Sequence, residues 1–242
     1  MIIKKLILIN FKNHSERDFQ LSPHINCFVG NNGVGKTNVL DALHYLSMGK
    51  SFLGLSDHQN IKNNKEFFSI TSNIINNDRE DTIKISLNKD AKKIVKKNDK
   101  PYPKIAEHIG YLPNVIISPY DSNLISDSGD SRRKFIDAMI SQTDAEYLFS
   151  LIQYQKAIQQ RNALLKLFAK NKTFDRDSLD IYSQPIITHG TRIFQKRKTF
   201  VTDLKPIVQH FYDIISGGKE LININYESHL SERDFGSLLE ES

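Results

Sequence analysis

Cysteine is almost absent from this chain, which has one, Cys27, in 242 residues. A single cysteine excludes an internal disulfide and fits a reducing compartment such as the cytosol. Because Cys27 falls in an apolar stretch, we expect it to be a small buried side chain. No apolar run approaches the roughly 20 residues that a membrane-spanning helix needs, and Met1–Leu6 has no secretory signal pattern. We therefore expect a cytoplasmic protein that does not enter a membrane.

One complete nucleotide-binding motif is present: Gly30–Thr37 reads Gly-Asn-Asn-Gly-Val-Gly-Lys-Thr and matches G-x-x-x-x-G-K-[ST]. The apolar run Ile25–Val29 predicts a strand before it, and the pattern of Val39–Leu46 predicts a helix after it. In such a phosphate loop, successive backbone N–H groups surround phosphate oxygens. The helix directs the positive end of its dipole at the same anion. The alternative, an ordinary glycine turn, is disfavoured by the order strand, loop and helix.

The chemistry of this loop assigns a role to each residue. Lys36 is expected to reach the β- and γ-phosphates of ATP, and Thr37 to place its hydroxyl on Mg²⁺. The backbone contacts fall to the rest of the loop: Gly30, Asn31, Asn32, Gly33, Val34 and Gly35. None of the eight histidines stands at metal-ligand spacing from a cysteine or an acid, so no zinc site is expected.

Positive charge is concentrated in one segment. The chain has a net charge of +5, and the segment 89–104 holds seven lysines and two aspartates, which is the same excess. Clustered lysines bind nucleic acid through counterion release, whereas a solvated hairpin tip explains the same charges without a ligand. Both interpretations stay open. The lysines concerned are Lys89, Lys92, Lys93, Lys96, Lys97, Lys100 and Lys104.

Hydrophobic periodicity divides the chain into three stretches. Residues 1–118 are predicted to form a lobe of strands around the phosphate loop, and residues 119–216 a helical lobe. Residues 217–242 are predicted to form a return strand and the start of a further part of the first lobe, cut short at Ser242. The expected strands are Ile2–Phe11, His14–Leu21, Phe67–Ile75, Asp81–Leu87, Lys92–Lys96, Asn114–Ser118 and Glu220–Tyr226.

Three helices are expected after residue 119. Apolar residues at three-and-four spacing from Leu148 to Phe168 predict one packed helix. A second should run from Ser178 to Ile215 and end at Gly217-Gly218. A last, short helix carries Phe235, Leu238 and Leu239 on one face, with Ser231 as its expected cap.

Two motifs that accompany ATP hydrolysis are missing. A hydrolytic phosphate loop works with a Walker B strand, four apolar residues ending in Asp, which helps to hold Mg²⁺. Val115-Ile116-Ile117 ends in Ser-Pro instead, and no Ser-Gly-Gly signature followed by four apolar residues and Asp is present. This chain is therefore expected to bind nucleotide without efficient hydrolysis, or to be part of a longer protein.

Several segments, in order, resemble the RecF family of bacterial DNA replication and repair ATPases over essentially the whole chain. Leu8–Asn13 is similar to the family's opening strand and turn, and Gly30–Leu43 to its phosphate loop and helix. Two blocks are more specific, Arg132–Asp137 with its Arg-Arg pair and Tyr154–Leu165 with Gln-Arg-Asn. Leu53 departs from the family, which usually has arginine there.

The resemblance implies an α/β fold: a P-loop NTPase of the ABC-head type found in SMC and Rad50 proteins, with an antiparallel β subdomain and an inserted helical lobe. It implies ATP and Mg²⁺ as cofactors and an ATP-dependent homodimer. It also implies binding to double-stranded DNA near single-strand gaps and junctions, RecO and RecR as partners, and roles in replication, repair and the SOS response. The whole protein would be a slow DNA-dependent ATPase.

The resemblance also suggests further site residues. Lys12 and Asn13 match the early turn that approaches the nucleotide, with a plain solvated turn as the alternative. Asp121 matches a linker that senses Mg²⁺. Arg132, Arg133 and Arg161 are candidates for DNA contact or for structural ion pairs, which arginine also favours. Two alternatives to the RecF hypothesis remain: another SMC-like head ATPase, RecN-like or of the overcoming-lysogenization-defect type, or a non-catalytic DNA-binding module whose loop holds a structural anion.

Overall fold

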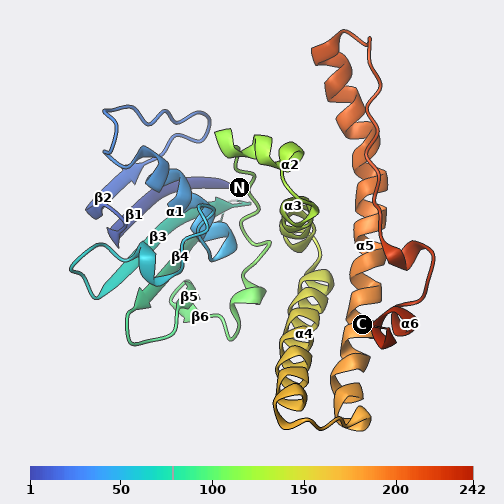
Figure 1. Cartoon of the computed structure of the whole chain (residues 1–242). Coiled ribbons are helices and arrows are strands. Elements are labelled where there is room, and N and C mark those ends of the chain that lie inside the picture. The colour runs from blue at the N-terminus through green and yellow to red at the C-terminus, as the bar shows by residue number, and fades with distance from the viewer. Residues whose placement is uncertain (78, 242) are drawn as a thin grey trace. The chain divides into compact units, whose positions relative to one another are not determined.

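The computed structural model describes residues 1–77 and 79–241, so the predicted end at Ser242 lies outside the described residues. The chain forms two compact units, Met1–Tyr120 and Asp121–Ser242. The first, blue to green in Figure 1, is a sheet with a helix on one face, and the second is helical. Within the described residues, no helix has the length and apolar character needed to cross a membrane.

The first unit is built on a six-stranded sheet with the order β2-β1-β3-β4-β5-β6, in which every neighbouring pair is antiparallel. Short connections join β1 to β2 and β3 to β4, so most of the pairing is local. This confirms the predicted antiparallel strands to within a few residues. The strands are β1 (Ile2–Phe11), β2 (His14–Gln20), β3 (Phe67–Asn76), β4 (Arg79–Asn88), β5 (Ile94–Lys97) and β6 (Lys100–Pro101).

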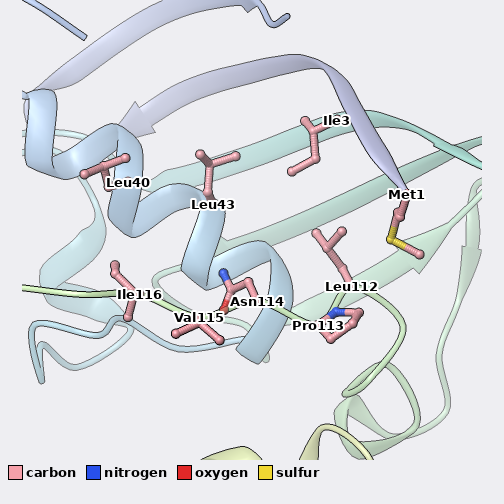
Figure 2. Close-up of a pocket in the computed structure, with 9 residues that line it drawn as sticks. All are labelled: Met1, Ile3, Leu40, Leu43, Leu112, Pro113, Asn114, Val115 and Ile116. Atoms are coloured by element: carbon pink, nitrogen blue, oxygen red, sulfur yellow. The ribbon is translucent and has the colours of Figure 1, made fainter. Parts of the chain in front are cut away.

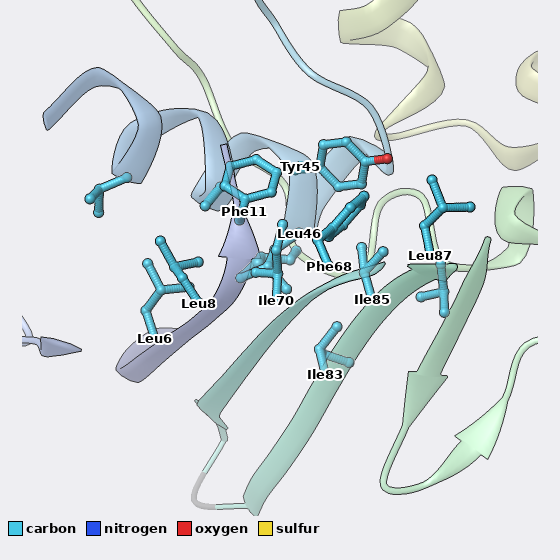
Figure 3. Packing of buried hydrophobic residues seen from close by; sticks show 14 of the residues in the cluster. Leu6, Leu8, Phe11, Tyr45, Leu46, Phe68, Ile70, Ile83, Ile85 and Leu87 are labelled. Carbon is cyan, nitrogen blue, oxygen red and sulfur yellow. The ribbon is translucent and has the colours of Figure 1, made fainter. Parts of the chain in front are cut away.

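Helix α1 (Lys36–Met48) covers one face of this sheet. Strand alternation places Leu6, Leu8 and Ile70 on that face, and all three are fully buried. The rings of Phe11, Tyr45 and Phe68 pack edge to face, with centroids 5.4–5.9 Å apart (Figure 3). This core fixes the direction of α1. Two 3₁₀ turns, η1 (His58–Asn60) and η2 (Ile105–Glu107), lie in the connections.

Two predicted strands of the first unit are wrong. Ile25–Val29 and Asn114–Ser118 are extended, but neither pairs with a strand among the residues that the structure describes. Several of their apolar side chains are exposed, such as Ile25 at 82% and Ile117 at 84%, and Cys27 is exposed rather than buried. An apolar run forms a strand only where a neighbouring strand pairs with it, and in the described part of the chain the six-stranded sheet includes neither run.

The second unit is a helical hairpin with short helices around it. Helices α4 (Ala145–Asn171) and α5 (Arg176–Ser216) lie side by side (Figure 1). Lys172 ends α4 in a left-handed conformation and Gly217 ends α5, which confirms the two predicted long helices and the glycine stop. The remaining elements are η3 (Pro119–Ser122), α2 (Asn123–Ser126), α3 (Gly129–Ser141), η4 (His229–Ser231) and α6 (Phe235–Glu240).

A partly buried ion pair joins three of these helices. Arg197 of α5 donates to both carboxylate oxygens of Asp137 in α3, at 2.8 and 2.7 Å. Tyr147 of α4 donates its hydroxyl to the same carboxylate at 2.5 Å. Apolar side chains around Ile140 and Ile193 pack beside the pair. Asp137, the last residue of the Arg-Arg block, therefore has a structural role in this unit.

The end of the second unit differs from the prediction. Glu220–Tyr226 is not a strand, and the described part of 217–241 contains none. The last helix, α6, does form, but Asp234 caps it by accepting from the Ser237 N–H, so the predicted cap, Ser231, is wrong. The Phe235 ring fills the space beside Gly190 of α5, where a side chain would clash with it. This contact holds α6 against the hairpin.

The stability of the first unit should fall on acidification because of His108. Its ring is fully buried, and Nε2–H donates to the Leu46 carbonyl at the end of α1, 2.6 Å away. Burial lowers the pKa of His108 below the usual 6.5, although the Leu46 hydrogen bond opposes this and Lys97 adds to it. The unfolded chain then binds more protons than the folded one, so the free energy of unfolding decreases as the pH falls below 6.5.

Thermal unfolding of the wild type and of His108→Gln, measured from about pH 7.5 to about pH 5.5, tests this. The variant should be less stable at the higher pH but lose less stability on acidification. His24→Gln, at an exposed histidine, should keep the wild-type pH dependence. If the stability of the wild type and of His108→Gln changed with pH in parallel, the proposed role of His108 would be contradicted.

Candidate nucleotide-binding site

The phosphate loop, Gly30–Thr37, runs into the first turn of α1. Gly35 precedes the helix with φ 101°, in the left-handed region that favours glycine. A side chain at this position would also meet Asn13 and His14, with atoms 2.5 and 2.6 Å from its Cβ. Gly35 is therefore required twice, for its backbone angle and for the close approach of the turn between β1 and β2.

Two side chains of that turn hold carbonyls of the phosphate loop. Asn13 donates from Nδ2 to the Gly33 carbonyl at 3.1 Å, and its Oδ1 accepts from Asn38 of α1 at 2.8 Å. His14 lies with Nε2 3.2 Å from the Gly35 carbonyl. These contacts hold the Gly33 and Gly35 carbonyls toward the turn. In a phosphate loop it is the backbone N–H groups that face the anion.

His14 is a site residue that the sequence analysis missed. Burial lowers the pKa of His14, with Arg17 and Lys62 adding to the effect and the Gly35 carbonyl opposing it. The ring is therefore neutral near neutral pH, and Nε2–H donates to Gly35. Its position next to Lys12-Asn13 was the available signal, but its partner lies 21 residues away in the chain.

Lys36 folds back over the loop. Its ammonium donates to the carbonyls of Gly30 and Asn31 at 2.8 and 2.9 Å. The positive charge thus lies at the mouth of the loop, next to the positive end of the α1 dipole. Thr37 follows in the first turn and is exposed. The arrangement offers an anion site with a hydroxyl beside it, as the motif predicts.

Lys12 is placed differently from Asn13. Its ammonium forms an ion pair with Asp41 of α1, and the two side chains are only 7% and 0% exposed. The charge of Lys12 is therefore already compensated inside the fold. Its predicted contact with the nucleotide stays a prediction, as does that of Asp121, which is the first residue of the second unit.

The predicted arginines of the second unit make local contacts. Arg132 donates to the carbonyls of Leu124 and Asp127 at 3.0 and 2.9 Å, and so closes the end of α2. Arg161 donates to the Leu239 carbonyl at 3.3 Å. Arg133 is half exposed, with Asp130 3.7 Å away. Structural contacts thus account for Arg132 and Arg161, whereas Arg133 keeps much of its side chain in solvent.

Three lysines of the segment 89–104 are paired. Lys93 reaches the C-terminal end of α1, where it donates to Asp57 and to the Gly49 carbonyl, both at 2.6 Å. Lys97 pairs with Asp81, and Lys89 with Glu66. Within the described part of the chain, the others form no ion pair: Lys92, Lys96, Lys100 and Lys104.

An apolar cavity lies on another side of α1. It has a volume of about 350 Å³ and is lined by residues such as Leu40, Leu43 and Val115 (Figure 2). None of its lining side chains is charged, and all but that of Asn114 are apolar. Such side chains do not suit a phosphate, so the loop remains the candidate anion site. Within the described residues, no group of three or more His, Cys, Asp or Glu side chains is placed to hold a metal.

Comparison with known proteins agrees with this geometry. The model of the AAA domain family matches residues 5–229. The DNA replication and repair protein RecF of Flavobacterium johnsoniae is 50% identical over 242 residues, which is 100% of this chain and 67% of that protein. The protein of the same name from Phocaeicola vulgatus is 40% identical and is covered over 65% of its length.

This chain belongs to the RecF family. It spans about two thirds of the length of the curated relatives it matches. This chain is also similar to a solved structure of the recombination mediator protein RecF-ATPrS of the RecFOR pathway, with 30% sequence identity and a TM-score of 0.88. The match covers 99% of this chain and 64% of the chain in that structure. The predicted family and the predicted fold class, an α/β P-loop NTPase head with an antiparallel sheet, are confirmed.

The position of Lys93 predicts a difference between adjacent lysines. Lys93→Met removes a cation from Asp57 and from the end of α1, and should lower the free energy of unfolding by about 1–2 kcal/mol, since Asp57 is partly exposed. Lys92→Met, at an exposed site, should change it by less than about 0.5 kcal/mol. Urea unfolding measures both, and equal effects would contradict the anchoring role of Lys93.

Proposed function

We propose that this chain binds ATP with Mg²⁺ at the phosphate loop. The observation that carries the proposal is the loop itself: an ammonium at its mouth, a helix N-terminus behind it, and carbonyls held away by Asn13 and His14. Family membership supports the same ligand, because two solved RecF structures that resemble this chain are of RecF-ATPrS and RecF-ATP.

The roles proposed for the residues follow from their positions. Lys36 would leave the Gly30 and Asn31 carbonyls for the β- and γ-phosphates, and the N–H groups of residues 30–35 would cradle the phosphate oxygens. Thr37, exposed in the first turn of α1, fits a Mg²⁺ ligand, and the ion would neutralise phosphate charge when bound. Lys12 and Asp121 remain proposed as nucleotide and Mg²⁺ residues on the resemblance alone.

We further propose how the whole protein uses this site. Residues 1–118 would form the ATP-binding lobe, 119–216 the helical lobe, and 217–242 the start of the C-terminal part of the ATP-binding lobe. The complete chain would dimerise with ATP, bind duplex DNA near single-strand gaps and junctions, and aid recombinase loading with RecO and RecR in the cytoplasm. Support comes from relatives named as DNA replication and repair proteins.

A non-catalytic DNA-binding module is the second candidate. The exposed lysines of the segment 89–104 favour it, because clustered cations bind nucleic acid through its phosphates. In that case the phosphate loop would hold an anion without nucleotide selectivity. Nucleotide titration distinguishes the two candidates.

Lys36→Ala should weaken ATP·Mg²⁺ binding about tenfold or more, because it removes a charge-assisted contact to the phosphates. Isothermal titration calorimetry measures the affinity, and hydrolysis should be negligible for every form. Lys50→Ala, at an exposed lysine beyond the other end of α1, should bind like the wild type. Equal affinity of Lys36→Ala and wild type would favour the second candidate.

DNA affinity should fall steeply with salt, because lysines that bind phosphates release counterions. Neutral glutamine at Lys92, Lys96, Lys100 and Lys104 should reduce the dependence of log affinity on log salt by about 1 for each phosphate that the variant no longer neutralises. Fluorescence anisotropy with duplex DNA measures it. Replacement of Lys166 and Lys170, exposed in α4, is the control. An unchanged slope in the quadruple variant would remove the lysine segment from the interface.

A further inference from the structure

We propose that Asp41 is a positioning residue of the nucleotide site, which it controls through Lys12 and the turn between β1 and β2. The inference rests on the proposed function, since it concerns the same phosphate loop. Asp41 lies one helical turn after Thr37 on the same side of α1. Its side chain is fully buried, so it acts on the loop through other residues.

Three groups converge on the buried carboxylate of Asp41. Ser51 donates its hydroxyl at 2.8 Å, and the Phe52 N–H donates at 2.8 Å to the other oxygen. The third group is the ammonium of Lys12, which forms an ion pair with the carboxylate. A carboxylate without water needs such partners, because an unpaired buried charge is strongly unfavourable. The carboxylate therefore ties both Lys12 and the segment after α1 to the helix that carries the phosphate loop.

The tie to Lys12 leads directly to the loop. Lys12 has φ 52°, a left-handed conformation that is uncommon outside glycine, so the turn needs outside contacts to hold its shape. The next two residues, Asn13 and His14, are those that contact the Gly33 and Gly35 carbonyls. A shift of Lys12 would therefore move both contacts.

Other contacts hold the same turn from its far side. The Lys12 N–H donates to the Asn60 carbonyl at 2.8 Å, and the Lys62 ammonium donates to the Asn13 carbonyl at 2.9 Å. These bonds restrict the backbone of the turn but do not connect it to α1. Two contacts make that connection, the exposed Asn38–Asn13 hydrogen bond and the buried Asp41–Lys12 ion pair. The buried pair therefore helps to set the position of the turn relative to the loop and helix.

A comparison within the fold separates positioning from general stabilisation. Asp57 also anchors α1, through Tyr45 and Lys93, but at the C-terminal end of the helix and away from the loop. Loss of either carboxylate should destabilise the first unit. Loss of Asp41 should also change the conformation of the phosphate loop, because Asp41 is linked to Asn13 and His14 through the turn. Loss of Asp57 should leave the loop unchanged.

The experiment compares Asp41→Asn, Lys12→Met and their double variant with Asp57→Asn. Each protein is first shown to be folded by circular dichroism, and ATP·Mg²⁺ affinity is then measured by calorimetry. Asp41→Asn and Lys12→Met should each weaken binding about tenfold, and the double variant should be close to either one, because both act through one contact. Lys12→Arg, which keeps the cation, should recover most of the affinity, and Asp57→Asn should bind like the wild type.

A second readout does not depend on nucleotide. In ¹⁵N-labelled protein without ligand, the amide resonances of Gly33 and Gly35 should move in Asp41→Asn and stay in place in Asp57→Asn. If the wild type binds no ATP, the proposed function fails, and these resonances still decide the positioning role. If Asp41→Asn does not fold, the Lys12 variants decide it by the same measurements. Unchanged glycine resonances and affinity in a folded Asp41→Asn or Lys12→Met would overturn the proposal.

Discussion

The packing of α1 on the antiparallel sheet is the constraint on which the rest of the first unit depends. Val39, Ala42, Tyr45 and Leu46 are almost completely buried against the strands. Full burial of one large apolar side chain contributes about 1.5–3 kcal/mol, whereas a typical hydrogen bond contributes about 1 kcal/mol. The apolar face therefore determines the position of α1 and the direction of its N-terminus. The weaker polar contacts determine only the local conformation of the loop.

Polar side chains then fix each end of the helix separately. At the N-terminal end, Asn13 and His14 hold the phosphate loop by its carbonyls. At the C-terminal end, Lys93 and His108 donate to the carbonyls of Gly49 and Leu46, which have no partner within the helix. The site is thus a helix terminus inside a framework that restricts its rotation, which is the preorganisation that anion binding needs.

Local patterns in the sequence predicted the parts of this framework that form from neighbouring segments. The hairpins β1–β2 and β3–β4, helix α1 and the two long helices follow from alternation, helical spacing and terminal glycine. The predicted strand Ile25–Val29 failed because pairing depends on a partner elsewhere, which an apolar run does not reveal. The partners of Lys12 and Lys93 were also not predictable, because Asp41 and Asp57 lie far along the chain. Asn13 was recognised by resemblance, whereas His14 and Asp41 needed the fold.

Helix α5 has a mechanical consequence of its own. Its 41 residues extend roughly 60 Å at 1.5 Å per residue. Pro185 and Pro206 lie inside it, and each lacks the N–H that would bond the carbonyl four residues earlier. Bending therefore costs less free energy at these two prolines than elsewhere in α5. A force applied at one end of the helix would bend it at Pro185 and Pro206 and leave the segment between them straight.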